Sequence, residues 1–285
     1  MDTQKENIKT ESFRPPKAYD NREFLMGKDA RTLRILAEFL EPMSRFKRLK
    51  VKDTVVFFGS ARIRSEATVR EELSKLVKGK APVNQIRKSN AALEMSKYYE
   101  DTVELAYQLT KWSMKLKPNK RFVICSGGGP GIMEAANLGA RKANGLTIGL
   151  NISLPLEQYP NKYISKNLNF EFHYFFMRKF WFAYLAKALV IMPGGFGTLD
   201  ELLEILTLIQ TKKIKKRMPI VIYGKDYWHD ILNFEELHRK GMISKKDLKL
   251  FKFVNTPTEA FEYLKNELSK NYINVEASLF NHKKY

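Results

Sequence analysis

Two short apolar runs each end in a cluster of glycines and then continue in a helical pattern, and this arrangement narrows the choice of fold more than any other feature. Residues 121–125 lead into the segment SGGGPGIMEAA, and residues 188–192 lead into PGGFGTLDELLEI. A run that is apolar at every position is typical of a strand buried on both faces. A helical pattern directly after it indicates a strand–loop–helix unit.

Similar units recur along the chain. We expect strands at residues 54–58, 121–125, 146–150, 168–172, 188–192, 219–223 and 251–254. We expect helices at residues 29–46, 90–116, 132–143, 174–187, 227–240 and 257–270, with a further helix opened by Thr198. This alternation implies right-handed crossovers. The sequence predicts an α/β, Rossmann-like, doubly wound and mostly parallel sheet with helices on both faces, plus an N-terminal helical extension.

We expect three regions along the chain. Residues 1–50 form an N-terminal arm and an amphipathic helix, residues 51–272 form a Rossmann-like nucleotide-binding catalytic domain, and residues 273–285 form a frayed tail. Within the domain, residues 62–89 are charged and contain Gly79 and Pro82, so we expect an irregular excursion there.

The net charge of +19 is the abnormal bulk property of the chain. A basic surface can attract phosphate-bearing partners, including nucleic acid. The lysines are spread over the whole chain, however, and no basic motif interleaved with aromatic residues appears. We therefore expect solvated helix ends rather than a nucleic-acid partner, and salt-sensitive RNA binding would favour the alternative.

The remaining composition excludes several kinds of site. A single cysteine, Cys125, rules out an internal disulfide. The most apolar stretch, residues 180–192, is interrupted by Lys187, so we expect no membrane partner and a cytoplasmic location. We expect no metal and no cofactor, because no ligand spacing joins the four histidines His173, His229, His238 and His282.

Both glycine-rich turns are candidate anion sites. Glycines let backbone N–H groups approach an oxygen closely, and the start of a helix carries partial positive charge. The first loop is not a dinucleotide fingerprint, because the third required glycine falls on Ile132, and no Walker sequence is present. The alternative is that its glycines serve only tight turning and helix packing.

The second loop has a partly structural explanation. Thr198 and Glu201 fit a capping box, which would account for Glu201 without catalysis. The helix would bury Leu199, Leu202, Leu203 and Leu206, which leaves Asp200, Glu201 and Glu204 toward the loop side or solvent. Capping does not explain the approach Pro-Gly-Gly-Phe-Gly, which brings bare backbone and a carboxylate to the same rim. We therefore favour a functional role for this loop.

The two loops, together with Met177-Arg178-Lys179, resemble the three landmarks of the LOG ("Lonely guy") family, whose signature is PGGxGTxxE and whose members are often mislabelled lysine decarboxylases. The similarity runs from about residue 54 to residue 270. It implies a Rossmann-like fold, a homodimer or larger homo-oligomer, and hydrolysis of the N-glycosidic bond of nucleoside 5′-monophosphates. The implied substrates are AMP or cytokinin nucleotides, which release the free base and ribose 5-phosphate.

The resemblance implies roles for particular residues. Arg178 and Glu201 would be the catalytic pair, and Glu157 would contact the base or ribose. Other substrate-binding residues would be Gly128, Gly129, Lys179, Gly194, Gly195, Phe196, Gly197, Thr198, Asp200 and Thr207, with Gly194–Thr198 cradling the phosphate. Two departures are that Asp200 replaces a glutamate and that Phe175-Phe176 replaces a Met-His pair.

The proposed chemistry suits these residue types. Cleavage of the ribosyl C1′–N bond builds positive charge on the sugar, which the carboxylate of Glu201 can stabilise while it activates water. Arg178 stays charged at any working pH, so we assign it to binding rather than to proton transfer. Two other hypotheses remain open: a non-catalytic nucleotide- or cofactor-binding protein, and a basic RNA-associated protein.

Overall fold

The computed structural model describes residues 14–154 and 159–274. Its centre is one seven-stranded sheet in the order β4-β3-β2-β1-β5-β6-β7, in which every pair of neighbours is parallel. The strands are β1 Asp53–Phe58, β2 Phe122–Ser126, β3 Thr147–Ile152, β4 Asn169–Phe172, β5 Ala186–Ile191, β6 Ile220–Tyr223 and β7 Phe251–Val254. The fold is therefore the predicted α/β, Rossmann-like one, with a sheet that is fully parallel.

The strand order places a switch point at the middle of the sheet. The chain starts at β1, proceeds outward to β4, and then crosses back to β5 on the other side of β1. In doubly wound sheets, the loops that leave two strands at such a point diverge and open a crevice at their carboxyl ends. The loops after β1 and β5 therefore define the place where a ligand is expected.

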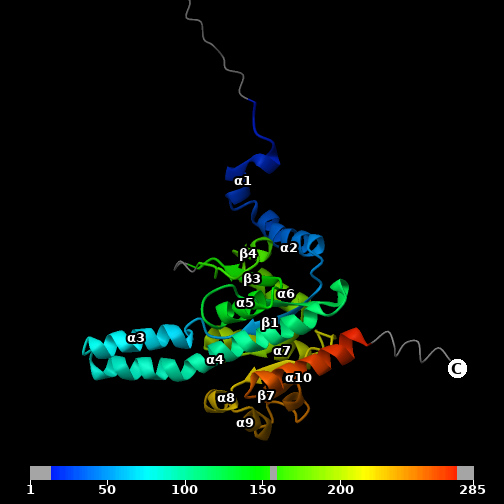
Figure 1. The fold of residues 1–285 in the computed structure, drawn as a ribbon. Coiled ribbons are helices and arrows are strands. Elements are labelled where there is room, and N and C mark those ends of the chain that lie inside the picture. Colours follow the sequence, from blue (N-terminus) through cyan, green and yellow to red (C-terminus); the bar gives the residue numbers. More distant parts are fainter. Residues whose placement is uncertain (1–13, 155–158, 275–285) are drawn as a thin grey trace, which may run out of the picture.

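Helices cover both faces of the sheet (Figure 1). The longer ones are α2 Arg31–Arg48, α3 Glu66–Lys78, α4 Val83–Met114, α5 Ile132–Lys142, α6 Phe175–Leu185, α7 Phe196–Gln210 and α10 Pro257–Leu268. The short ones are α1 Arg22–Met26, α8 Lys225–Ile231 and α9 Phe234–Arg239. Among the described residues, no helix is both long enough and apolar enough to cross a bilayer.

Alternate residues of each central strand enter separate cores. In β1, Val55 and Phe57 pack with α4, α5 and α10, whereas Val56 and Phe58 pack with α6 and α7. The side chains of Phe57 and Val56 are fully buried. The period of two in a strand explains this division, and it is why these strands are apolar throughout.

The predicted N-terminal helix packs on α6 and thereby braces the helix that carries Arg178. Its residue Glu38 accepts hydrogen bonds from the backbone N–H groups of His173 (2.7 Å) and Tyr174 (3.2 Å). The indole N–H of Trp181 donates to the carbonyl oxygen of Glu38 at 3.0 Å. The start of α6 is therefore held from outside the sheet.

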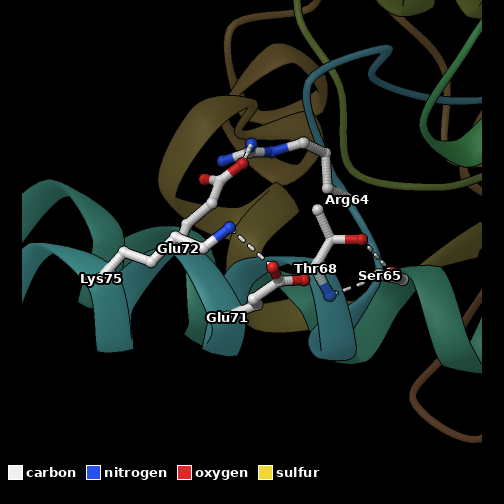
Figure 2. Close-up of polar contacts among 6 residues, drawn as sticks. All are labelled: Arg64, Ser65, Thr68, Glu71, Glu72 and Lys75. Carbon is white, nitrogen blue, oxygen red and sulfur yellow. Dashed lines mark hydrogen bonds and ion pairs between the residues drawn. The ribbon is translucent and has the colours of Figure 1, made fainter.

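The irregular excursion predicted for residues 62–89 is wrong, because α3 and the first turns of α4 form a helical hairpin there that extends beyond the sheet (Figure 1). The hydroxyl of Ser65 caps α3 by accepting from the N–H of Thr68 at 3.4 Å. Lys75 pairs with Glu71 at 2.6 Å, and Arg64 pairs with Glu72 (Figure 2). Caps and i,i+4 pairs stabilise a charged helix, and the predicted breakers only form the turn between the two helices.

One helix start also differs from the prediction, and the difference concerns the site. Helix α7 begins at Phe196, with Gly195 as its N-cap, rather than at Thr198. The carbonyl oxygen of Gly195 accepts from the N–H groups of Thr198 and Leu199, each at 3.0 Å. The predicted capping box is therefore wrong, because Thr198 already lies inside the helix and Glu201 is not needed at its end.

Candidate active site

A cavity of about 800 Å³ opens at the carboxyl ends of the central strands. Its wall comes from the loops after β1, β2 and β5, from the end of β3, and from α6, α7 and α8. Residues that line it include Ser60, Arg62, Gly127, Gly129, Asn151, Phe175, Arg178, Phe182, Gly194, Gly195, Phe196, Gly197, Thr198, Glu201 and Tyr227. Both predicted glycine loops therefore contribute to one cavity at the switch point of the sheet.

The first turn of α7 supplies free N–H groups to this cavity. Among the described residues, the backbone N–H groups of Gly195, Phe196 and Gly197 have no hydrogen-bond acceptor. A Cβ added to Gly195 or to Gly197 would meet no atom within 4 Å, so space beside these residues is open. Unpaired N–H groups at the start of a helix form a favourable anion site.

Two contacts turn carbonyl groups of this loop away from that anion site. The N–H of Ser60 donates to the carbonyl oxygen of Pro193 at 3.0 Å. The hydroxyl of Tyr227 donates to the carbonyl oxygen of Gly194, also at 3.0 Å. Because a trans peptide places C=O and N–H on opposite sides, fixing the Gly194 carbonyl also fixes the N–H of Gly195.

Backbone geometry explains why glycines are needed in the first loop. Gly128 and Gly131 have φ angles of +78° and +69°, values that L side chains rarely adopt. A Cβ at Gly131 would lie 2.4 Å from the carbonyl oxygen of Ser60. The loop is held from the other side by Asn161, whose side chain donates to the carbonyl oxygens of Gly128 (3.0 Å) and Gly129 (3.1 Å). Tight turning, the structural alternative, therefore accounts for part of this loop.

Arg178 lies in the first turn of α6 and lines the cavity, and it forms no ion pair with a carboxylate within residues 14–154 and 159–274. Its guanidinium lies 5.2 Å from the ring of Phe175 and 5.6 Å from that of Phe182. Its Nε atom is buried and has no hydrogen-bond partner among the described residues. Burial lowers the pKa of Arg178, although the charges of Glu201 and Asp200 oppose that effect. A guanidinium with unused donors in a cavity is suited to bind an anionic or hydroxylated ligand.

Glu201 lines the same cavity as the second glycine loop, on the loop side as expected, and it is only 5% exposed rather than facing bulk solvent. Burial raises its pKa, although the charges of Lys179 and Arg178 act in the opposite direction. A carboxylate with a raised pKa is suited to general base catalysis near neutral pH. The residue that contacts it directly is Lys179, with Nζ 3.2 Å from Oε1.

Lys179 connects three carboxylates of α7, of which Glu201 is buried and Asp200 is exposed. Its Nζ also lies 2.7 Å from Oδ2 of Asp200 and 2.7 Å from Oε2 of Glu204. Burial opposes protonation, but the hydrogen bonds to Asp200 and Glu204 and the charge of Glu201 raise the pKa of Lys179. Its ammonium therefore stays charged and holds Glu201 in position beside the cavity.

The structure brings together most, but not all, of the predicted site residues. Eight line the cavity: Gly129, Arg178, Gly194, Gly195, Phe196, Gly197, Thr198 and Glu201. Gly128, Lys179 and Asp200 do not line it: Gly128 packs against Asn151, Lys179 contacts Glu201, and the exposed Asp200 pairs with Lys179. Thr207 is exposed farther along α7, where its hydroxyl donates to the carbonyl oxygen of Leu203 at 2.8 Å. Glu157 lies outside the described residues.

Sequence reasoning missed four of the residues that line the cavity: Ser60, Arg62, Asn151 and Tyr227. Ser60 and Arg62 follow β1, and Asn151 lies near the end of β3. The sequence did contain a signal for Ser60 and Arg62. They lie in and just after the Gly59-Ser60 turn that follows β1, and the carboxyl ends of all parallel strands lie at the same edge of the sheet. Tyr227 carried no such signal, since it reaches Gly194 from a different helix.

A family model described as "Possible lysine decarboxylase" matches residues 133–264, which include α6 and the second glycine loop. This part of the chain is similar to the LOG family, and the match confirms the resemblance found in the sequence. The similarity and the Rossmann-like fold support a nucleotide-related or cofactor-binding function.

The words "lysine decarboxylase" in that description find little support in the chemistry of the residues around the cavity. A lysine that forms a Schiff base needs a neutral amine, which usually results from an apolar or cationic environment. Lys179 instead contacts three carboxylates, which stabilise its charged form. Lys179, which contacts Glu201 of the cavity, is therefore unsuited to that role.

Solved structures of low sequence identity are similar to this chain. The molybdenum cofactor carrier protein from Chlamydomonas reinhardtii is 18% identical, with a TM-score of 0.47 over 76% of this chain and 99% of that one. The molybdenum cofactor binding protein from the phototrophic bacterium Rippkaea orientalis is 21% identical, with a TM-score of 0.40 over 58% of this chain and 87% of that one. No curated protein matches the chain.

Proposed function

We propose that this protein hydrolyses the N-glycosidic bond of nucleoside 5′-monophosphates, AMP or cytokinin riboside monophosphates, to the free base and ribose 5-phosphate. The observation that carries the proposal is the arrangement in one cavity of free N–H groups from the start of α7, the unpaired guanidinium of Arg178 and the buried carboxyl of Glu201. This combination binds an anion and places a carboxylate beside it.

The phosphate binds in the cradle formed by residues 194–198. Its oxygens accept from the N–H groups of Gly195, Phe196 and Gly197, and the dipole of α7 adds favourable charge. The phosphate is distant from the bond that breaks, so its binding energy serves to position C1′. A nucleoside that lacks the phosphate should therefore be a poor substrate.

Glu201 acts at the sugar. As the C1′–N bond lengthens, its electron pair moves to the base nitrogen and positive charge develops on the ribose. The carboxylate stabilises that charge and accepts a proton from the attacking water, and this proton then passes to the departing base. Lys179 orients Glu201, and Arg178 binds the phosphate or ribose through its planar donors. All of these groups belong to residues 51–272, which we propose as the catalytic domain.

The experiment that tests this function is a product assay over the common nucleoside 5′-monophosphates, with the matching nucleosides as controls. We expect free base and ribose 5-phosphate from at least one monophosphate and little turnover of its nucleoside. Equal turnover of both would contradict the phosphate cradle. Tight binding without products would favour the non-catalytic nucleotide-binding alternative.

We also propose that the protein forms a homodimer or larger homo-oligomer through the outer face of α6. Three aromatic side chains at i,i+4 spacing are exposed there: Phe176 (52%), Phe180 (36%) and Tyr184 (58%). The rings of Phe180 and Tyr184 stack at 5.1 Å. Exposed apolar patches of this kind mark association surfaces. Light scattering should show an oligomer that Phe176→Glu with Tyr184→Glu dissociates, and an unchanged mass would contradict this role for α6.

A further inference from the structure

Asn151 is a buried polar residue that the proposed reaction leaves without a role. It is the fifth residue of β3, it is only 5% exposed, and it nevertheless lines the cavity. A polar group removed from water is costly unless it finds a hydrogen-bond partner. The question is therefore which of its atoms remain available to a ligand.

Neighbouring groups fix the orientation of the Asn151 carboxamide. Its Nδ2 donates to the carbonyl oxygen of Phe170 at 2.8 Å and to Oδ1 of Asn169 at 2.7 Å. A main-chain carbonyl oxygen can only accept, so the atom facing Phe170 must be the nitrogen. Both N–H donors are used on β4. The oxygen, Oδ1, accepts no hydrogen bond from any described residue.

Two consecutive residues of the first glycine loop lie beside this free acceptor and beside Arg178. A Cβ added to Gly128 would lie 2.2 Å from Oδ1 of Asn151, so the carboxamide packs directly against the bare Cα of that glycine. A Cβ added to the preceding residue, Gly127, would lie 3.9 Å from Nη1 of Arg178. Consecutive glycines thus bring a fixed acceptor and an unpaired donor to the same turn of the cavity wall.

We propose that Oδ1 of Asn151 accepts a hydrogen bond from an O–H or N–H donor of the bound nucleotide and thereby determines specificity. The proposal rests on the proposed function, which it extends to the recognition of the substrate. The donor is a ribose hydroxyl or the exocyclic amino group of the base. An analogue that lacks this donor leaves a buried acceptor unpaired, which is how a polar site rejects a close relative of its ligand.

The test compares binding of AMP, 2′-deoxy-AMP, 3′-deoxy-AMP and IMP by titration calorimetry. Each is titrated into the Glu201→Gln protein, in which turnover is blocked, with and without Asn151→Ala. With Asn151 present, we expect one analogue to bind roughly 5- to 150-fold more weakly than AMP. With Asn151→Ala, we expect that analogue and AMP to bind equally, and the analogue that loses its disadvantage identifies the donor.

The matched control is Asn169→Ala, which removes the same hydrogen bond between the two side chains but leaves the acceptor in the cavity. The Asn169→Ala protein should still bind AMP more tightly than the analogue that lacks the donor. Discrimination ratios that Asn151→Ala leaves unchanged for every analogue would overturn the proposal.

The outcomes separate this inference from the proposed function. Discrimination that depends on Asn151, in a chain that has Glu201 but does not hydrolyse AMP, would contradict the hydrolase and leave the inference standing. Hydrolysis of AMP, together with affinity ratios between AMP and its analogues that Asn151→Ala does not alter, would support the hydrolase and contradict the inference. Failure to bind any of the four nucleotides would contradict both.

Discussion

The hydroxyl of Tyr227 donates a 3.0 Å hydrogen bond to the carbonyl oxygen of Gly194, and this contact ties α8 to the loop that precedes α7. It holds one face of the Gly194–Gly195 peptide, so the N–H on the opposite face stays available to a ligand. Burial raises the pKa of Tyr227, although the bond to Gly194 opposes that shift, so the hydroxyl remains a donor at neutral pH. A residue outside both glycine motifs thus shapes the proposed phosphate cradle.

The first prediction follows from this contact. Tyr227→Phe keeps the ring but removes the donor, so the peptide loses its restraint and AMP binding should weaken about tenfold. The loss should appear in KM more than in kcat, because Tyr227 does not approach the reacting bond. Steady-state kinetics measures both, and Tyr263→Phe on α10 is the matched control. A Tyr227→Phe enzyme with unchanged KM would refute the positioning role.

The glycines of the second loop give a prediction that separates binding from folding. Gly197→Ala adds a Cβ where no atom lies within 4 Å. The free energy of unfolding should therefore stay the same or rise by about 0.5–1 kcal/mol. The same methyl group narrows the phosphate cradle, so AMP binding should fall. Gly194→Ala should instead destabilise the fold by about 1–3 kcal/mol, because its Cβ would lie 2.1 Å from Oγ1 of Thr198. Thermal melts with and without AMP distinguish the two effects, and equal melting losses would contradict this difference.

Glu201→Gln should lower the activity of the protein and raise its stability at pH 7. Loss of the general base should lower kcat by about 10²- to 10⁴-fold. Because burial raises the pKa of Glu201 in the folded chain, the folded protein binds this proton more tightly than the unfolded chain. The ionised carboxyl therefore costs stability above that raised pKa, and the cost disappears below about pH 4, where the unfolded chain is protonated too. Melting curves should show Glu201→Gln as the more stable protein at pH 7, with a gap that closes in acid. A less stable variant at pH 7 would contradict the raised pKa.

A second titration involves Lys216, which lies between α7 and β6, contacts the last turn of α6 and does not line the cavity. Its Nζ donates to the carbonyl oxygens of Ala183 (2.7 Å) and Tyr184 (2.8 Å), and burial, together with the charge of Lys187, lowers its pKa to about 8. Between about pH 8 and its ordinary value near 10.4, the unfolded chain binds this proton and the folded chain does not. Stability from this group should therefore rise with pH in that window, by up to about 1.4 kcal/mol per pH unit. The free energy of unfolding, measured by denaturation at several pH values, should not rise in this window for Lys216→Met. It should rise for the exposed control Lys213→Met. The same pH dependence in both variants would contradict the lowered pKa.

Much of the fold was predictable because its central strands are buried on both faces. The run from Val55 to Phe58 is apolar at every position, which no surface strand requires. Helix α3 was missed for the opposite reason, since its inner face is only Val69 with the half-buried Leu73 and Leu76 among many charges. Its stability comes from a serine cap, ion pairs and packing on α4.

The site was predictable where it depends on backbone and unpredictable where it depends on contacts between distant elements. Glycines before a helix indicate free N–H groups, and the structure brings those of the second loop to the cavity. The pattern around Thr198 led to a wrong start for α7. The true N-cap, Gly195, has no side chain that would indicate a helix start in the sequence. The pairing of Glu201 with Lys179 depends on how α6 and α7 pack, which no local pattern encodes.

The most direct test of the central claim is to identify the products formed from AMP by the full-length protein and by Glu201→Gln, using chromatography that resolves adenine, adenosine, ribose 5-phosphate and phosphate. A cavity that holds the phosphate at α7 and places Glu201 at C1′ should give adenine and ribose 5-phosphate in equal amounts, and none with Glu201→Gln. Adenosine and phosphate as the products, or undiminished turnover by Glu201→Gln, would contradict it.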